Sequence, residues 1–501
     1  MALVRNVVLN FIGELSPLVV SLLALPVVIR GLGIERFGVL SLAWVLIGYF
    51  NLFDLGLGRA TTKCVAEHVE TGDQSASRRL VWTALLLQGM LGSLGGLLLA
   101  VATPFLTASM FHVSAGLVEE AKRSLYWLSV SVPFLMLSSA LRGVLEARQR
   151  FDLVNAVKAP ANCLLSLAPV IGVALRFDLP SIMLLQVLGI AGSTLLYYAL
   201  VCKVFPGVKG RAGIDVSAVR SLATFAGWTT LILGAASGVV HLERVLLGMM
   251  LPVSAVGYYM PAYALASKLW IIPQSVFLAA FPAFSALAVT QKEELERLFI
   301  QTLRLTVVSV GIVAITLVFF ADPFLTLWLG RELAQHCQLS LQILAVGFFL
   351  NSQAWVPSTL LQGLGRVKVV AYVFLCELPL YSIVTWWLIR RMGIEGAALA
   401  WAVRGSAEAV VFLAIAGKAL SFSPRTLIRN GVLAGFLLAA VLAVAVGAMT
   451  VLGLGLLWRI GIGCTVLGAY GWYAWNWLVS PGLQTRGRWF VELFRGILVP
   501  E

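Results

Sequence analysis

Long apolar segments separated by short charged clusters run along the whole chain. Each segment reaches about 20 residues, which at about 1.5 Å per residue is enough for a helix to cross ~30 Å of hydrocarbon. The run at 253–287 is too long for one straight span, and Pro261, Pro273 and Pro282 are expected to bend it or limit its ends. The pattern predicts an all-α polytopic membrane protein with fourteen spans, at 7–29, 38–58, 80–106, 124–145, 153–175, 181–202, 217–240, 253–287, 300–320, 338–362, 368–389, 394–417, 430–450 and 453–478.

The composition agrees with hydrocarbon as the main solvent. Of the 501 residues, 60% are hydrophobic and 12% are charged, whereas soluble domains carry about 25% charged residues. The net charge of +13 does not indicate nucleic-acid binding, because the basic residues alternate with spans instead of forming a tail or a stripe. The six cysteines form no CxxC pair and are expected to be reduced core residues.

Lysine and arginine are divided unevenly between alternate loops. With a cytoplasmic N-terminus, the inner segments hold more than twice as many of them as the outer segments. The positive-inside rule then places both termini in the cytoplasm and favours an even number of spans. The basic, amphipathic tail at 481–501 is expected to lie on the inner leaflet. The outer cations are Arg30, Arg36, Lys122, Arg123, Arg176, Arg244, Arg331, Arg390, Arg391 and Arg459.

The two halves of the chain resemble each other at an offset of about 220 residues. GIERFGVLSLAW (33–44) aligns with PVSAVGYYMPAY (252–263), with Gly38 over Gly257. LRGVLEARQRFDLVNA (141–156) aligns with LQGLGRVKVVAYVFLC (361–376), with Gly143 over Gly363. An even number of helices per unit predicts a parallel repeat about an axis along the membrane normal; chance similarity between glycine-punctuated hairpins is the alternative.

The repeat suggests a domain organisation. The predicted parts are a six-helix lobe at 1–210, a second six-helix lobe at 211–420, two additional spans at 421–480 and a cytoplasmic tail at 481–501.

The segment LGIERFGVLSLAWVLIGYFNLFDLGLGRATTKCVAE (32–67) resembles the amino-terminal signature of polysaccharide and O-antigen repeat-unit flippases. These belong to the multidrug/oligosaccharidyl-lipid/polysaccharide (MOP) exporter superfamily, which includes the MATE transporters. LRGVLEARQRFD (141–152) and MGIEGAALAWAV (392–403) agree with this resemblance, which covers essentially the whole chain. Its motifs are built from glycine and apolar spacing, so they identify the family better than the substrate.

The resemblance implies two lobes around a central cavity lined by spans one, two, seven and eight. It also implies alternating access, a bacterial plasma membrane, and an undecaprenyl-pyrophosphate-linked oligosaccharide as cargo for O-antigen, capsule or exopolysaccharide synthesis. The implied partners are this lipid-linked substrate and membrane lipids, with a polysaccharide polymerase and glycosyltransferases beside them.

Cations inside the spans are candidate substrate ligands, because a charge at the bilayer centre costs about 2.5–3.5 kcal/mol on insertion scales. A pyrophosphate group needs donors that replace its hydration. We predict binding by Lys268, Arg59, Lys158, Arg142 and Arg404. Lys268 ranks first because it is mid-span on a helix that the resemblance places at the cavity, and Arg59 second, at the inner mouth. Alternatively, Lys268 snorkels or pairs with a carboxylate, and Arg59 is a topology charge.

Carboxylates inside the spans are candidates for coupling to H⁺ or Na⁺, and they are Glu14, Asp54 and Glu377. Two of them have a structural alternative. Glu14 could pair with an interior cation, and Asp54 could be solvated at a helix end. Arg404 and Glu408 lie four residues apart, share a helix face and are interpreted first as a structural pair. Lys158 and Glu377, at equivalent repeat positions, could pair between the halves or each within its own.

Motifs for chemistry are absent from the sequence. It has no G-x-x-x-x-G-K-[ST] loop and no HExxH, and its four histidines are scattered. We therefore predict transport without catalysis, cofactor or metal. Two alternatives remain: a cation-coupled multidrug exporter of the same superfamily, and a non-transporting scaffold for glycan synthesis. Fourteen spans and interior cations favour an anionic cargo, whereas a scaffold predicts that the interior charges are dispensable.

Overall fold

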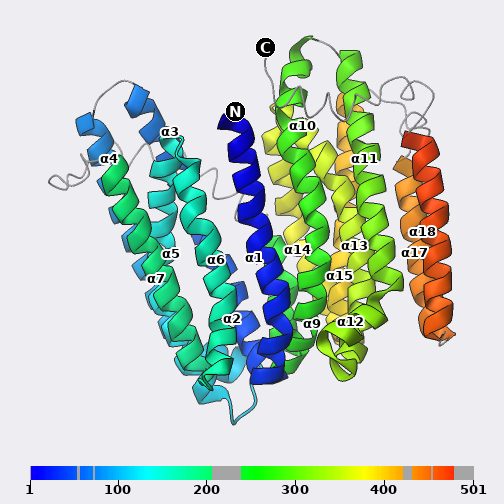
Figure 1. Cartoon of the computed structure of the whole chain (residues 1–501), viewed down its shortest axis with the longest axis horizontal. Coiled ribbons are helices and arrows are strands. Elements are labelled where there is room, and N and C mark those ends of the chain that lie inside the picture. Colours follow the sequence, from blue (N-terminus) through cyan, green and yellow to red (C-terminus); the bar gives the residue numbers. More distant parts are fainter. Residues whose placement is uncertain are drawn as a thin grey trace. The chain divides into compact units, whose positions relative to one another are not determined.

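The computed structural model describes residues 2–53, 57–70, 74–205, 238–290, 292–420, 432–452 and 455–478. Within these ranges every regular element is a helix, which confirms the predicted all-α class (Figure 1). The helices are α1 (Ala2–Leu32), α2 (Ile34–Phe53), α3 (Leu57–Glu70), α4 (Gln74–Phe105), the π-helix η1 (Leu106–Met110), α5 (Val118–Ala147), α6 (Phe151–Ala174), α7 (Leu179–Val204), α9 (Val253–Ala266), the 3₁₀-helix η3 (Ser267–Trp270), α10 (Ile271–Thr290), α11 (Lys292–Phe319), α12 (Ala321–Leu329), α13 (Arg331–Gly363), α14 (Val367–Met392), α15 (Ile394–Leu420), α17 (Val432–Val451) and α18 (Leu456–Leu478). Residues 238–250 are also helical.

The helices match the apolar segments of the sequence. Nine helices in the described ranges are long and apolar enough to cross a membrane, so the chain is a multi-pass membrane protein. Every predicted span has a helix at its place, apart from the portion of the seventh span before residue 238, which lies outside the described residues. The total of fourteen spans stays a prediction.

The long eighth segment is interrupted, as its prolines predict. It consists of α9 and α10 joined by the 3₁₀ turn η3. Pro273 has no N–H to donate to the carbonyl of Leu269, and its ring crowds that carbonyl, so the α-helical ladder fails just before it. The other two prolines, Pro261 and Pro282, lie inside α9 and α10.

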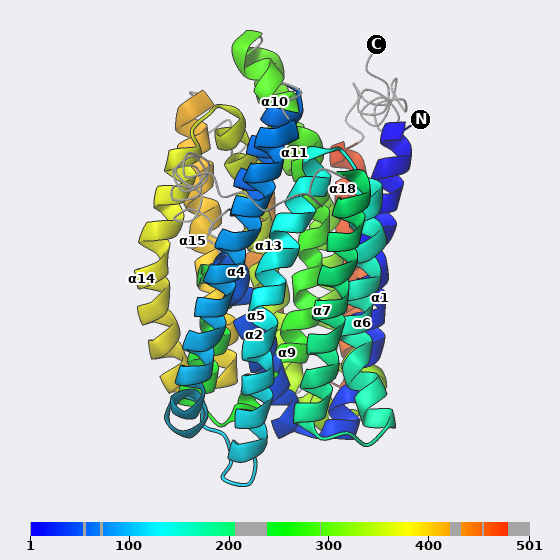
Figure 2. The same cartoon turned by 90° about the vertical axis from the view of Figure 1, so that its left-hand side faces the viewer.

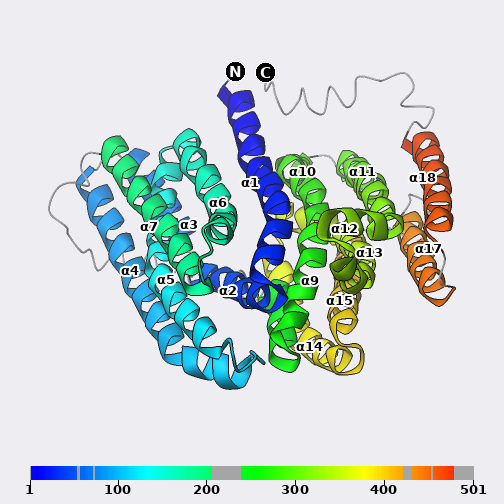
Figure 3. The same cartoon turned by 60° about the horizontal axis from the view of Figure 1, so that its bottom comes forward.

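Two short helices were not predicted. The second span, expected at 38–58, begins at Ile34 and ends at Phe53, and the chain resumes as the separate helix α3. The short α12 follows α11 and packs against α13 (Figure 3). At only 9 residues, it is too short to cross a membrane and too polar at Asp322 to register as an apolar span.

The chain divides into two compact units, unit 1 (Met1–Gly257) and unit 2 (Tyr258–Glu501). The predicted domain borders at 210, 420 and 480 fall in or beside 206–237, 421–431 and 479–501, which lie outside the described residues, as does the predicted tail. Those borders therefore stay predictions.

Helix packing repeats between the units. In unit 1, α4 packs on α5, α5 on α7 and α6 on α7 (Figure 2). In unit 2, α11 packs on α13, α13 on α15 and α14 on α15. In predicted span order these are the same three pairs: third with fourth, fourth with sixth, and fifth with sixth of each half. The arrangement supports the predicted repeat.

The glycines that align the two halves make corresponding contacts. In unit 1, a Cβ at Gly38 would overlap the carbonyl oxygen of Val253, and a Cβ at Gly257 would overlap that of Ile34. Because each overlapped residue precedes the other glycine by four positions, this crossing of α2 and α9 is reciprocal. Close backbone approach through glycine is how membrane helices pack tightly.

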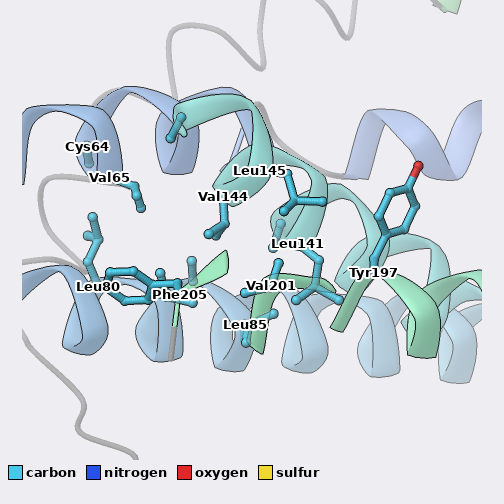
Figure 4. Packing of buried hydrophobic residues seen from close by; sticks show 14 of the residues in the cluster. Cys64, Val65, Leu80, Leu85, Leu141, Val144, Leu145, Tyr197, Val201 and Phe205 are labelled. Carbon is cyan, nitrogen blue, oxygen red and sulfur yellow. The ribbon is translucent and has the colours of Figure 1, made fainter. Parts of the chain in front are cut away.

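The second glycine pair behaves in the same way within each unit. A Cβ at Gly143 of α5 would lie 2.6 Å from the carbonyl oxygen of Gly58 on α3. A Cβ at Gly363 of α13 would lie 3.1 Å from the Cβ of Phe284 on α10. In both halves the fourth span thus packs onto the continuation of the second. Beside the unit 1 contact, apolar side chains of α3, α4, α5 and α7 form a core that includes Val65, Leu80, Leu141, Val144 and Val201 (Figure 4).

The two last helices attach to the ninth and tenth spans. α18 packs on α11, and α17 packs on α11 and α13. The hydroxyl of Tyr470 donates a hydrogen bond to the carbonyl of Val307 at 2.9 Å, and Gly311 leaves the room that this ring needs.

Replacing either glycine of the α2–α9 crossing is expected to destabilise the protein. In Gly38→Ala or Gly257→Ala the new Cβ meets a backbone carbonyl that cannot rotate away, and overpacking of this kind costs about 1–3 kcal/mol. Gly192→Ala on α7 is the matched control, because nothing lies within 4 Å of its Cβ position. Thermal unfolding in detergent should show lower midpoints for the first two variants only; equal midpoints for all three would contradict the reciprocal contact.

Candidate functional site

A buried ion triad lies between α14 and α15 in unit 2. The Nη1 of Arg404 donates to Oε1 of Glu377 at 3.3 Å and to Oε2 of Glu408 at 3.2 Å. The side chains are 3%, 12% and 9% exposed, respectively. The Arg404–Glu408 pair follows from their i,i+4 spacing on one helix, as predicted, and Glu377 adds a second carboxylate from the neighbouring helix.

Aromatic rings enclose this triad. The guanidinium of Arg404 lies over the ring of Trp401 at 4.8 Å and over that of Tyr381 at 5.5 Å, which adds cation–π attraction in a site shielded from water. The ring of Trp401 stacks on that of Phe348 with centroids 3.8 Å apart. Two carboxylates and one guanidinium in such a place carry one excess negative charge when all are ionised, and that state is costly in a low dielectric.

One carboxylate oxygen of the triad is left over. Oε2 of Glu377 is buried, and among the residues that the structure describes nothing donates a hydrogen bond to it. Buried carboxylate oxygens normally accept hydrogen bonds, so Oε2 of Glu377 is an acceptor of the triad that the described residues leave unused.

A hydrogen-bonded path leads from the triad to the 3₁₀ turn η3. Asn351 of α13 donates from Nδ2 to Oε2 of Glu408 at 2.6 Å. Its Oδ1 accepts from the indole Nε1 of Trp270 at 2.9 Å. Trp270 is the last residue of η3, and Lys268 lies two positions before it. The path therefore joins the buried triad to Trp270, which belongs to the same turn as the mid-span lysine.

Small residues place Asn351 on this path. A Cβ at Gly405 of α15 would lie 2.8 Å from the Cβ of Asn351, and one at Gly347 of α13 would lie 2.7 Å from the Cα of Ala402. These contacts let α13 and α15 cross closely, as small residues do in membrane bundles. Asn351 is only 2% exposed as a result.

Lys268 differs from Arg404 in its surroundings. It is half-buried, and within the part of the chain that the structure describes no carboxylate lies at ion-pair distance from it. Arg404, in contrast, is held by two carboxylates. Of the two interior cations predicted in unit 2, Arg404 has carboxylate partners, whereas Lys268 has none within the described ranges.

The candidates in unit 1 lie on separate helices. Arg142 of α5 is half-exposed and 3.7 Å from Glu146, and Lys158 of α6 is half-buried. Arg59 lies on α3, next to the point where Gly58 meets Gly143, so its backbone and that of Arg142 flank one helix crossing.

Three further candidates, Glu14, Asp54 and Arg59, lie wholly or partly outside the described residues. Asp54 and the side chains of Glu14 and Arg59 lie outside the described residues. Glu377 forms its ion pair inside its own unit, with Arg404, which is the local alternative to a pair with Lys158.

One residue predicted to lie in a loop lies in a helix instead. Arg244 was assigned to an outer loop, but it is 6% exposed within the helical stretch 238–250. It pairs with the fully buried Glu243 at 3.2 Å, and its Nη2 contacts Nδ1 of His241 at 2.6 Å. Because arginine only donates, Nδ1 accepts and the histidine proton sits on Nε2. The predicted span ends at residue 240 because hydropathy scores Glu243 and Arg244 as polar, whereas in the structure they pair with each other and are buried.

The residues of this network that sequence reasoning missed are neutral. Asn351, Tyr381 and Trp401 carry no charge and were not singled out. A signal did exist for the first, since Asn351, Ser352 and Gln353 form a polar run within an apolar helix.

Residues 3–288 match the protein family described as "Polysaccharide biosynthesis protein". The chain belongs to this family. Over 420 residues it is 25% identical to the putative O-antigen transporter of Shigella flexneri, an alignment that covers 82% of this chain and 97% of that protein. The predicted membership of a polysaccharide biosynthesis family with O-antigen transporter relatives is thereby confirmed.

Solved structures show the fold of this polysaccharide biosynthesis protein. An inward-facing multidrug resistance MATE family transporter of the MOP superfamily has a TM-score of 0.71 at 14% identity, covering 82% of this chain and 98% of its own. The lipid II flippase MurJ, in its inward closed conformation, has a TM-score of 0.70 at 12% identity, covering 95% and 100%. These proteins are named as transporters and a flippase, none as an enzyme, in agreement with the prediction of transport without catalysis.

Removing the cation of the triad is expected to be strongly destabilising. Arg404→Met leaves two buried carboxylates without their partner, and breaking a buried pair in this way costs about 3–5 kcal/mol. Arg142→Met is the matched control, since its pair with Glu146 is 42% and 33% exposed and such pairs contribute about 0–1 kcal/mol.

Thermal unfolding in detergent measures both variants. The triple variant Arg404→Met/Glu377→Gln/Glu408→Gln should recover much of the loss, because it removes the unpaired charges. If Arg404→Met unfolds at the same temperature as Arg142→Met, the triad does not hold these helices together.

Proposed function

We propose that this protein is a flippase that moves lipid-linked polysaccharide repeat units from the inner to the outer leaflet of a bacterial plasma membrane. The observation that carries the proposal is Lys268, a half-buried cation in a break of a membrane helix, without an ion-pair partner in the described part of the chain. A lone interior charge is costly and is kept where a substrate uses it. The family and the relative from Shigella flexneri supply the class of cargo.

The chemistry of the cargo fits this site. An undecaprenyl-pyrophosphate head carries negative charge that must be matched by donors when it leaves water. Lysine presents a compact charge with three donors that can follow a moving phosphate. Broken membrane helices are also where transporters bind charged ligands, because the interrupted backbone offers polar groups at mid-membrane. Alternating access of the two lobes would carry the bound head across.

Unit 1 supplies cations for capture. Arg59 and Arg142 flank the α3–α5 crossing at the end of the second span, which the topology rule assigns to the cytoplasmic side. Both termini are cytoplasmic in this arrangement. Glycosyltransferases would meet the protein on the cytoplasmic side, where the repeat unit is made. A polymerase would meet it on the outer side, where the repeat unit is used. In this scheme Arg404 balances charge rather than contacting the cargo, since its positive charge is already matched by two carboxylates at ion-pair distance.

The coupling ion in this scheme is a proton taken up by the triad, at Glu377. Its Oε2 lacks a hydrogen-bond donor among the described residues, and a proton there removes the excess charge. A sodium ion fits less well, because the guanidinium of Arg404 already lies between the carboxylates and repels a second cation. Glu14 and Asp54 remain further candidates for coupling.

Loss of the lysine charge is expected to reduce transport. Lys268→Ala removes a charge-assisted contact worth about 1.5–3 kcal/mol, which corresponds to a roughly 10- to 160-fold decrease in flipping rate if the contact strengthens during transit. Lys268→Arg should retain part of the rate. The measurement is the movement of a lipid-pyrophosphate-linked oligosaccharide across proteoliposomes that hold the purified protein.

Lys292→Ala is the control, because Lys292 is an exposed lysine at the start of α11. A normal rate with Lys268→Ala would remove this residue from the mechanism. Transport of organic cations in place of the glycan lipid would instead favour the multidrug exporter, and normal glycan assembly with every interior charge neutralised would favour the scaffold.

The identity of the coupling ion can be tested on the same vesicles. With Glu377→Gln we expect transport to lose its dependence on the pH gradient, because the amide cannot exchange a proton. Sodium gradients should have no effect on either protein. Sodium dependence that disappears in Glu377→Gln would reverse the assignment of the ion.

A further inference from the structure

We propose that Asn351 is a positioning residue that reports the protonation state of the ion triad to the 3₁₀ turn carrying Lys268. Its role in transport rests on the proposed function, whereas the coupling itself is a property of unit 2 alone. The path consists of two hydrogen bonds, from Trp270 to Asn351 and from Asn351 to Glu408.

The polarity of this path is fixed at both ends. The indole N–H of Trp270 can only donate, so it requires the amide oxygen of Asn351. An ionised Glu408 can only accept, so it requires the amide nitrogen. Asn351 satisfies both groups in one orientation and neither in the reversed one. Since Asn351 and Glu408 are buried, no bulk water replaces a lost partner.

A proton on the triad acts on this orientation. When Glu377 and Glu408 are both ionised, the bond from Asn351 is charge-assisted and strong. Because both carboxylates share the guanidinium of Arg404, they titrate as one system and a proton taken up at Glu377 lowers the charge that Asn351 meets. A proton on Glu408 itself turns the carboxyl into a donor, which favours the reversed amide and leaves the indole N–H facing an NH₂ group.

The turn η3 can change position when its hydrogen bond to Asn351 weakens. It interrupts a membrane helix, and 3₁₀ stretches inside helices often mark hinges. Apolar rings surround Trp270, with Phe348 at 5.0 Å, Trp401 at 5.8 Å and Trp355 at 6.3 Å. Its bond to Asn351 is the one polar side-chain contact that fixes this ring among the described residues. Weakening that bond frees the turn, and Lys268 moves with it.

The charged and titratable groups along this path come from three elements. Glu377 and Tyr381 belong to α14, Arg404 and Glu408 to α15, and Lys268 to η3. α13 contributes the neutral Asn351. Through the path, binding of an anion at Lys268 and binding of a proton at the triad influence each other, and this influence is necessarily reciprocal.

The test is fluorine NMR of the full chain labelled with 5-fluorotryptophan in detergent micelles. Trp270→Phe identifies the resonance of Trp270, and Trp355→Phe identifies that of its neighbour as a reference. In the wild type we expect the Trp270 resonance to shift as the pH is changed and the Trp355 resonance to shift less. In Asn351→Leu the titration of Trp270 should be lost.

A second variant keeps the test independent of whether Asn351→Leu folds. The double variant Glu377→Gln/Glu408→Gln preserves an acceptor for Asn351 but leaves no carboxyl of the triad to ionise, so the Trp270 resonance should stay at one position across the pH range. A Trp270 resonance that does not titrate in the wild type, or that titrates unchanged in this double variant, would overturn the proposal.

The transport assay separates this proposal from the proposed function. Trp270→Phe keeps an aromatic ring but removes the indole N–H that donates to Asn351. It should therefore flatten the pH profile of transport, while Trp355→Phe leaves that profile unchanged. If the resonance titrates through Asn351 but Lys268→Ala flips the glycan lipid normally, the coupling stands and the assignment of the cargo site fails. If Lys268 is required but the resonance does not titrate, the reverse holds.

Discussion

The interior of unit 2 is organised around one guanidinium shared by two buried carboxylates. Arg404 joins α14 to α15 through Glu377 and Glu408, and Glu408 in turn orients Asn351 on α13. Three membrane helices are therefore linked by a network in which each polar group depends on the next. Such networks gain little stability over an apolar core, but removal of one member exposes the others to a large desolvation cost. What the network provides is a single arrangement of these helices, and with it the position of the 3₁₀ turn at Trp270.

The two halves keep a common scaffold but not common charges. The paired glycines Gly38 and Gly257, and Gly143 and Gly363, make corresponding contacts because helix packing depends on the shape of the backbone. Lys158 and Glu377, one residue apart in this alignment, carry opposite charges. A repeat can therefore preserve helix packing while the charges diverge, since a charge depends on its immediate partners and a glycine on the approach of a neighbouring helix.

Hydropathy and local spacing predicted most of the fold. The spans follow from the length of apolar runs, the break before Pro273 from the missing N–H of proline, and the Arg404–Glu408 pair from helical periodicity. The contact between Glu377 and Arg404 could not be predicted in this way, because it joins two helices whose facing sides are set by tertiary packing. The error at Arg244 arises differently. Hydropathy scores each charged residue by itself, so it ends the predicted span at a charge even where two buried charges pair and the helix continues.

The difference between a neutralised arginine and an available lysine also bears on the energetics of the proposed cycle. If a dianionic head binds Lys268, the loaded carrier moves outward with one net negative charge, and the empty carrier returns with one positive charge. Both movements are favoured by a potential that is negative inside, at about 2.3 kcal/mol per full charge per 100 mV. Were Lys268 paired with a carboxylate of its own, the return step would gain nothing from the potential. Arg404, held by Glu377 and Glu408, cannot supply this charge, because together they are neutral or negative. The separation of the two cations thus allows one to serve the cargo and the membrane potential while the other serves the proton.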